Sequence, residues 1–197
     1  MIFYKFVKNS VIFASKIFFN VNYYGIENIP QNQGCIICCN HRSNWDPILI
    51  SKPIKKYLYF MAKEELFKYK FLGNFLKKLG AFPVARGKKD ASAITTSINL
   101  INNNNFIVIF PEGTRSKNGD FLKPKAGAAL IAYKAHADIL PIKIIYHEPI
   151  KFRSKIDVIY GKVIPANKLN ITENSLQQIR DASKFIMDNI KNLTPTK

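Results

Sequence analysis

Two short runs of this chain are continuously apolar, and they restrict its fold more than any other feature. Residues 35–39 read Cys-Ile-Ile-Cys-Cys, and residues 106–110 read Phe-Ile-Val-Ile-Phe. Successive side chains of a strand point to opposite faces, so such a strand must be covered on both faces of its sheet. Both runs therefore predict central strands of a largely parallel sheet.

Further apolar runs alternate with amphipathic stretches along the rest of the chain. We expect strands near 21–26, 34–39, 57–61, 81–85, 106–110, 138–145 and 156–161. We expect helices near 47–52, 63–79, 90–102, 126–136 and 173–191. This alternation predicts one α/β domain over residues 21–197, with a mostly parallel central sheet flanked by helices. A length of 197 residues suits a single domain.

The first 20 residues predict an amphipathic helix in front of that domain. Lysines interrupt the run before it reaches the ~18 apolar residues that a membrane span needs. At 100° per residue, Lys5, Lys8 and Lys16 share one polar stripe, and most of the phenylalanines lie outside it. The helix either lies in a bilayer interface or packs on the core of its own domain. A second basic and aromatic stretch at 67–79 favours the membrane surface.

The charge of the chain implies an anionic partner. Thirty basic residues against thirteen acidic ones give a formal net charge of +17. Nucleic acid, an anionic membrane, a phosphorylated substrate and an acidic carrier protein all fit such a field. A nucleic-acid-binding module would interleave lysines with exposed aromatic residues. Here the aromatic residues cluster in apolar helical faces, which favours lipid and predicts no nucleic acid as partner.

All three cysteines lie within residues 35–39. Small apolar residues of a buried strand are the simplest interpretation, although a cysteine nucleophile is a possible alternative. A second cysteine pair for a zinc site is missing from the sequence, so we expect no metal. Free thiols suit a reducing, cytosolic-side location.

A histidine and an aspartate follow the first apolar run, in the segment Asn40-His-Arg-Ser-Asn-Trp-Asp-Pro47. A neutral imidazole accepts a proton from a hydroxyl near pH 7, and a carboxylate can orient it. Residues five apart on a helix point roughly 140° away from each other, so His41 and Asp46 meet only across a curved loop. Pro47 favours such a loop, with the next helix beginning at Pro47 itself. Alternatively, Asp46 only caps that helix and His41 is a surface residue.

A second polar segment, Pro111-Glu-Gly-Thr-Arg-Ser116, follows the other apolar run. Ligand groups gather at the carboxyl ends of parallel strands. Gly113 allows close backbone approach, Thr114 offers a hydroxyl, and Arg115 offers a bidentate fork for a phosphate. Glu112 is expected to orient Arg115 or to accept a hydrogen bond from a substrate hydroxyl. A plain surface turn is the alternative.

Together these segments resemble the 1-acyl-glycerol-3-phosphate acyltransferase family, the bacterial PlsC type of the glycerolipid acyltransferases. The matching blocks are residues 40–47, 80–86, 110–116 and 139–142, and the resemblance covers roughly residues 20–165. It implies direct acyl transfer without a cofactor or metal. His41 would deprotonate the sn-2 hydroxyl of lysophosphatidate, which attacks the thioester of acyl-CoA or of an acidic acyl-carrier protein. Asp46 would hold and stabilise His41.

The resemblance also implies further site residues and a location. The acceptor would be bound by Arg86, Glu112, Gly113, Thr114 and Arg115, and the acyl pocket would be shaped by Leu140, Pro141 and Ile142. The enzyme would work at the cytoplasmic face of the membrane, as a peripheral or monotopic protein. Another lysolipid or an amino-lipid is the alternative acceptor. A catalytically inactive membrane scaffold is disfavoured, because His41, Asp46, Glu112 and Arg115 are all present.

Overall fold

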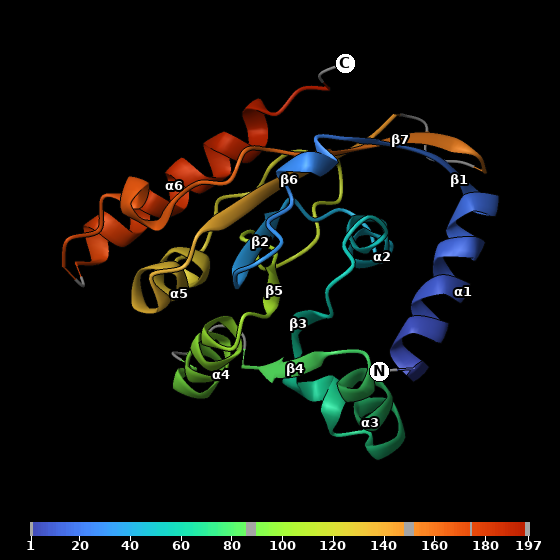
Figure 1. Cartoon of the computed structure of the whole chain (residues 1–197), viewed down its shortest axis with the longest axis horizontal. Helices are drawn as coiled ribbons and strands as arrows, with labels where there is room; N and C mark the ends of the chain where they lie inside the picture. The colour runs from blue at the N-terminus through green and yellow to red at the C-terminus, as the bar shows by residue number, and fades with distance from the viewer. Residues whose placement is uncertain (1, 86–89, 148–151, 174, 196–197) are drawn as a thin grey trace.

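Seven strands form one sheet in the part of the chain that the computed structural model describes, residues 2–85, 90–147, 152–173 and 175–195 (Figure 1). The spatial order is β1-β7-β6-β2-β5-β3-β4. The strands are β1 (Phe19–Tyr24), β2 (Cys35–Cys39), β3 (Leu58–Lys63), β4 (Ala81–Val84), β5 (Phe106–Ile109), β6 (Ile139–Tyr146) and β7 (Ser154–Tyr160). Neighbouring strands are parallel except for the antiparallel pair β6 and β7. The predicted, largely parallel α/β sheet is confirmed.

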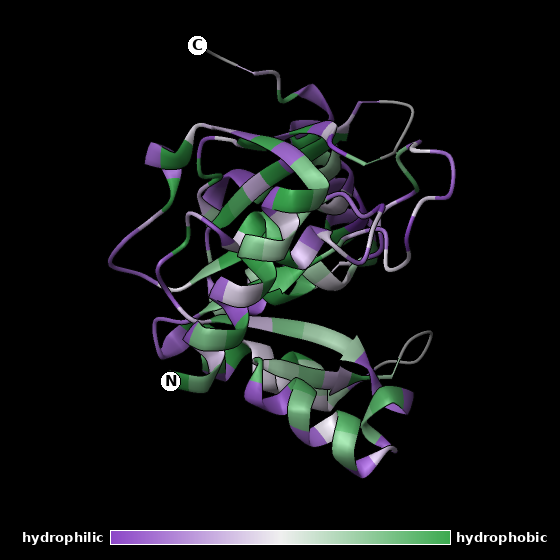
Figure 2. Cartoon of the chain, turned by 90° about the vertical axis from the view of Figure 1, so that its right-hand side faces the viewer, coloured by the Kyte–Doolittle hydropathy of each residue, from purple (hydrophilic) through white to green (hydrophobic). Residues whose placement is uncertain are grey.

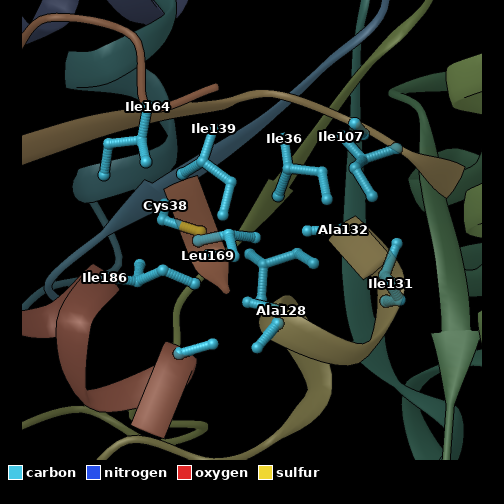
Figure 3. Packing of buried hydrophobic residues seen from close by; sticks show 14 of the residues in the cluster. Ile36, Cys38, Ile107, Ala128, Ile131, Ala132, Ile139, Ile164, Leu169 and Ile186 are labelled. Carbon is cyan, nitrogen blue, oxygen red and sulfur yellow. The ribbon is translucent and has the colours of Figure 1, made fainter. Parts of the chain in front are cut away.

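The two apolar runs are the central strands β2 and β5, and both of their faces are buried. Ile36 and Cys38 of β2 join a cluster on one face (Figure 3), whereas Cys35, Ile37 and Cys39 join a cluster on the other. Residues 106–109 of β5 divide between the same two clusters in the same alternation. This burial confirms that the cysteines are strand core.

Helices cover both faces of the sheet (Figure 1). They are α1 (Ile2–Phe18), α2 (Asp46–Ser51), α3 (Lys70–Lys78), α4 (Ala91–Asn102), α5 (Gly127–Ala135) and α6 (Leu176–Asn192), with short 3-10 turns at Ile26–Asn28, Glu64–Phe67 and Ala166–Leu169. α4, α5 and α6 lie on one side, while α1 and α2 lie on the other. β2 and β5 are therefore covered on both faces by helices, and the chain leaves the core at their carboxyl ends.

The helix predicted over residues 63–79 is wrong as a single element. β3 extends to Lys63, a 3-10 turn follows, and the chain bends at Tyr69 before α3 begins. Gly73 of α3 packs directly on the backbone of Phe67, where an added Cβ would lie 3.0 Å from the Phe67 Cα. The missing side chain at Gly73 allows the helix to fold back on the turn that precedes it.

α1 contacts the domain along one side, through both ring and polar contacts, and leaves several of its aromatic side chains exposed. The Tyr4 ring lies 4.1 Å from the Tyr57 ring, Lys8 Nζ donates to the Ile54 carbonyl at 2.6 Å, and Ser15 is buried. Its exposed apolar residues are Ile2, Phe3, Phe6, Phe13, Ile17 and Phe18. A helix that only packs on its own domain would bury these side chains instead. The structure thus combines an attachment of one side of α1 to the domain with an exposed apolar surface on the other side.

Candidate active site

The His41 segment begins where β2 leaves the sheet. The Asn40 side chain continues the pairing with β6, since its Nδ2 donates to the Ile144 carbonyl at 3.0 Å and its Oδ1 accepts from the Ile144 amide at 2.8 Å. The backbone itself is therefore free to turn away at residue 40. This places His41 at the carboxyl edge of the sheet, as expected from its position after an apolar run.

Residues 41–46 form the curved loop that the sequence predicts. His41 Nδ1 lies 2.8 Å from Asp46 Oδ2. The same oxygen accepts hydrogen bonds from the backbone amides of Arg42 at 2.7 Å and Ser43 at 2.8 Å. Three donors converge on one carboxylate oxygen, so the loop wraps around the Asp46 side chain. The interpretation of Asp46 as only a helix cap is excluded, because its Oδ2 accepts hydrogen bonds from residues that precede the helix.

One detail of this prediction is wrong. α2 begins at Asp46, not at Pro47, so Asp46 adopts a helical conformation in spite of the proline after it. The Asp46 amide donates to the Ser43 carbonyl at 3.2 Å, which closes a turn in front of the helix. Pro47 still fits at the second helical position, where its missing N–H leaves no hydrogen bond unmade.

The Asp46 carboxylate is completely buried and fully hydrogen bonded. Its second oxygen, Oδ1, accepts from the Tyr146 hydroxyl at 2.6 Å. Burial raises the pKa of Tyr146, and the negative charge of Asp46 raises it further, so this phenol stays a donor. An ionised carboxylate offers only acceptors, and its partner His41 Nδ1 must therefore carry the proton. Nε2 is then the unprotonated nitrogen, the one able to act as a base.

Glu112 holds the backbone of His41. Its Oε1 accepts from the His41 amide and its Oε2 from the Leu122 amide, both at 2.9 Å, and the side chain is 2% exposed. Burial raises the pKa of Glu112, while the two amide hydrogen bonds lower it. The carboxylate of Glu112 thus holds two backbone amides, whereas the Arg115 guanidinium is bonded to Asn44, and a contact of Glu112 with the acceptor stays a prediction. Glu112 is a positioning residue for His41.

Arg115 lies on the outer side of the same turn. Its Nη1 donates to Asn44 Oδ1 at 2.9 Å, which ties the Glu112 turn to the His41 loop. Arg115 and Thr114 are exposed, and Gly113 has a φ of 69°, in the left-handed region. The guanidinium is accessible to an anion next to the dyad. Arg86 lies outside the described residues.

A largely apolar cavity of about 320 Å³ opens beside His41. The His41 ring stacks on Phe110, with 4.0 Å between ring centroids. The remaining lining comes from the ends of β3, β4 and β5, from the Glu112 turn and from the start of α5: Met61, Val84, Ala85, Val108, Ile109, Pro111, Gly113, Lys125, Gly127 and Ala128. The cavity offers an apolar chain a place directly next to the candidate base.

The predicted acyl pocket at Leu140, Pro141 and Ile142 is wrong. These residues lie within β6, where Pro141 pairs with Cys38, and all three are buried. Leu140 and Ile142 belong to the core cluster on the α2 side of the sheet. A run of apolar residues in a strand has the same pattern whether it packs in a core or lines a cavity.

Two lysines at this edge of the sheet are not among the predicted site residues. Lys125 lines the cavity, and its side chain lies directly over Gly113, with Nζ 3.1 Å from the position of an added Cβ. Lys63 ends β3 at the same carboxyl edge. The predicted helix over 63–79 begins at this residue, so no strand-end pattern indicated Lys63. With Arg115, Lys125 makes the surroundings of His41 cationic.

The cysteine thiols are unsuited to nucleophilic attack. Burial raises the pKa of Cys35 to about 12 and raises the pKa of Cys38 and Cys39 as well. The thiolate is the reactive form of cysteine, and it is scarce at neutral pH in such surroundings. His41 lines the cavity, and none of the three cysteines does.

Comparisons with known proteins show which family the chain is similar to. Residues 20–145 match a family model described as Acyltransferase. A 1-acyl-sn-glycerol-3-phosphate acyltransferase of Bacillus subtilis is 38% identical over 139 residues, which cover 70% of this chain and 69% of that protein. One from Streptococcus pneumoniae is 35% identical over 153 residues, covering 74% of this chain and 56% of that protein. The crystal structure of the 1-acyl-sn-glycerophosphate acyltransferase PlsC from Thermotoga maritima aligns with a TM-score of 0.72 at 26% identity, over 95% of this chain and 78% of that chain.

Proposed function

The chain belongs to the acyltransferase family, and we propose that it transfers a fatty acyl group from a thioester to the sn-2 hydroxyl of lysophosphatidate, giving phosphatidate for phospholipid biosynthesis. The observation that carries this proposal is the 2.8 Å contact between His41 Nδ1 and Asp46 Oδ2 beside an apolar cavity. Acyl transfer to a lipid hydroxyl needs a base, a place for an acyl chain and a cationic site for the acceptor phosphate. All three lie within one edge of the sheet.

The dyad acts as a general base on the acceptor. His41 Nε2 takes the proton of the sn-2 hydroxyl as the oxygen attacks the thioester carbonyl carbon. The carbon–sulfur bond then breaks, and the sulfur leaves as a thiol with the proton from the imidazolium. Asp46 stabilises the imidazolium while it exists and keeps the ring in one orientation. A positioned base of this kind typically contributes ~10²–10⁴-fold to the rate.

Arg115→Ala is expected to raise the KM for lysophosphatidate about tenfold with a smaller change in kcat. A charge-assisted hydrogen bond to a phosphate contributes roughly 1.5–3 kcal/mol, and Arg115 stands exposed beside the dyad. Steady-state kinetics at varied acceptor concentration measure the effect. Lys117→Ala is the matched control, since it removes a charge from an exposed position two residues away. An unchanged KM for Arg115→Ala would remove this residue from the phosphate site.

Gly127→Leu is expected to shift the enzyme toward shorter acyl donors. Gly127 lines the cavity, and an added Cβ would meet no heavy atom within 4 Å, so the new side chain occupies open space. Excluding two methylenes of the acyl chain costs about 1.6 kcal/mol, or roughly tenfold in kcat/KM for long donors. Gly127→Ala serves as the small-volume control. An equal effect of Gly127→Leu on long and short donors would place the acyl chain elsewhere.

The thioester donor is acyl-CoA or an acidic acyl-carrier protein, both of which suit a chain with a net charge of +17. The chemistry assigned to His41 and Asp46 requires no resident cofactor and no metal ion. Nucleic acid is not expected as a partner, because the exposed aromatic residues cluster on α1 and near α3, as a lipid contact requires.

The protein attaches to the cytoplasmic face of the membrane as a peripheral or monotopic enzyme. No described helix is long and apolar enough to cross a bilayer. The support for attachment is the unburied apolar surface of α1, which continues to α3 and the turn before it through the contact of Phe3 with Phe75. α1 lies on the side of the molecule that faces the viewer in Figure 2.

Assays with a panel of acceptors test the proposed substrate. Purified protein is supplied with one acyl thioester and with lysophosphatidate, lysophosphatidylcholine, lysophosphatidylethanolamine or an amino-lipid. Lysophosphatidate is expected to give the highest kcat/KM, since its terminal phosphate carries the most negative charge for the cationic groups near the dyad. A higher kcat/KM for another acceptor would be consistent with acyl transfer but would contradict lysophosphatidate as the acceptor.

A further inference from the structure

A second cavity, of about 200 Å³, lies between the end of α1, β1 and the end of α2. It shares no lining residue with the cavity beside His41. Its polar lining consists of Ser15, Lys16, Asn20, Lys52 and Arg153 together with the Tyr23 ring edge. The acyl-transfer chemistry uses none of these residues, so the cavity requires a separate explanation.

Three cations from three distant segments converge on this cavity. Lys16 comes from α1, Lys52 from the end of α2, and Arg153 from the residue before β7. The lining contains no carboxylate. Lys52 Nζ lies 4.5 Å from the Tyr23 ring centroid, and both burial and the charge of Lys16 lower the pKa of Lys52. The two ammonium groups therefore repel each other, and an anion between them would relieve that repulsion.

Arg153 is fixed at this place by the backbone. Its φ is 62°, in the left-handed region that arginine seldom adopts. Its amide donates to the carbonyl of Phe18, the last residue of α1, at 2.7 Å. An unfavourable conformation persists only where the surrounding contacts determine it. The end of α1 and Arg153 are thus held together as one unit.

The cavity also borders the apolar surface of α1. Phe152, the neighbour of Arg153, meets Phe18 edge to face, with ring centroids 6.3 Å apart, and both rings are largely exposed. The exposed apolar residues Phe6, Phe13 and Ile17 continue this surface along α1. A group bound in the cavity would have its charged part among the cations and apolar side chains directly beside it.

We propose that this cavity binds the phosphate of an anionic phospholipid head group in the membrane on which α1 rests. The proposal builds on the membrane attachment described above. A soluble phosphate would satisfy the cations but would leave the aromatic border unused, whereas a membrane lipid uses both. Anionic lipids such as phosphatidylglycerol are favoured over zwitterionic ones, because their head group carries a net negative charge and no ammonium group that three cations would repel.

Vesicle binding tests the site independently of turnover. Flotation compares phosphatidylcholine vesicles with vesicles that also contain phosphatidylglycerol. The triple variant Lys16→Gln, Lys52→Gln, Arg153→Asn is expected to lose about 100-fold of the preference for anionic vesicles, since each basic side chain at such a surface adds roughly fivefold. Asparagine is chosen at position 153 because it tolerates a positive φ. If the triple variant fails to fold by circular dichroism, Lys16→Gln and Lys52→Gln alone should each lose about fivefold.

A charge-matched variant separates a defined site from the overall charge. Lys134→Gln, Lys168→Gln, Lys184→Gln removes three exposed lysines from α5, a 3-10 turn and α6, on the other side of the sheet from α1. It should retain most of the anionic preference. Equal losses in the two triple variants would overturn the site in favour of diffuse attraction. An unchanged preference of the triple variant for anionic vesicles, combined with a loss of binding to inorganic phosphate without vesicles, would show a soluble ligand instead and would also overturn it.

A further pair of changes keeps this test distinct from the membrane proposal. Phe6→Ser with Phe13→Ser should weaken binding to neutral vesicles, on which the cavity has little influence. Wild-type protein that binds neither vesicle type would overturn both the attachment of α1 and the lipid site. The acyl-transfer activity would still be judged by turnover of a detergent-dispersed acceptor.

Discussion

His41→Ala is expected to lower kcat by at least ~10²–10⁴-fold while leaving vesicle binding unchanged. The substitution removes the only imidazole that lines the described cavity beside the acyl-transfer site, and a positioned base contributes about that factor. Phosphatidate formation at saturating substrates measures the loss, and flotation measures membrane binding.

The chain supplies a close control for this variant. His147 Nε2 lies 2.7 Å from Asp157 Oδ2 in a second histidine–aspartate pair, which does not line the cavity beside His41. His147→Ala therefore removes an imidazole from a similar pair and should retain near-normal turnover. Near-normal activity of His41→Ala would contradict the role of His41 as the base.

Asp46→Asn is expected to lower kcat by as much as about 10⁴-fold, the cost of the analogous change in a serine-protease triad. The amide side chain would present an NH₂ group where Asp46 now accepts hydrogen bonds. Either its NH₂ meets the amides of Arg42 and Ser43 together with His41, or it meets the Tyr146 hydroxyl. In the first orientation His41 loses the acceptor that fixes its proton on Nδ1, so Nε2 no longer serves as a base.

The same change should also lower stability, because unsatisfied buried groups cost roughly 1–3 kcal/mol each. Thermal unfolding and kcat are measured on the same preparation. Tyr146→Phe is the matched control: it deletes one hydrogen bond to Asp46 and leaves its contact with His41 in place. We expect about a tenfold loss of kcat for Tyr146→Phe. If Asp46→Asn lowered kcat no more than Tyr146→Phe does, Asp46 would be a structural residue only.

The central part of the fold could be predicted because its sequence signals are local. Residues 35–39 and 106–109 are apolar on both faces, and the structure buries them on both faces. The helix over 63–79 could not be predicted correctly, since its interruption depends on how Gly73 packs against Phe67. Periodicity reports which face of a segment is apolar, and it does not report where the chain reverses.

In the site, too, contacts within one short segment could be predicted, whereas contacts between residues far apart in the sequence could not. The His41–Asp46 loop is encoded within six residues, and its predicted curvature is confirmed. Tyr146 and Glu112 act on that loop from 100 and 71 positions away, so no local pattern predicts their contacts. The error over Leu140 has the same origin, because only the packing of β6 between its neighbours shows that this residue is core.

The formation of phosphatidate by the wild-type protein tests the central claim most directly. Lysophosphatidate in detergent micelles is mixed with acyl-CoA or with the acylated acyl-carrier protein, and phosphatidate, free thiol and acylated enzyme are quantified by mass spectrometry. Direct transfer from the thioester to the acceptor, with His41 as the base, predicts one phosphatidate for each thiol released with at least one donor, and no acylated enzyme. No phosphatidate with either donor would contradict the proposed function. A stoichiometric acyl adduct of the enzyme would contradict direct transfer.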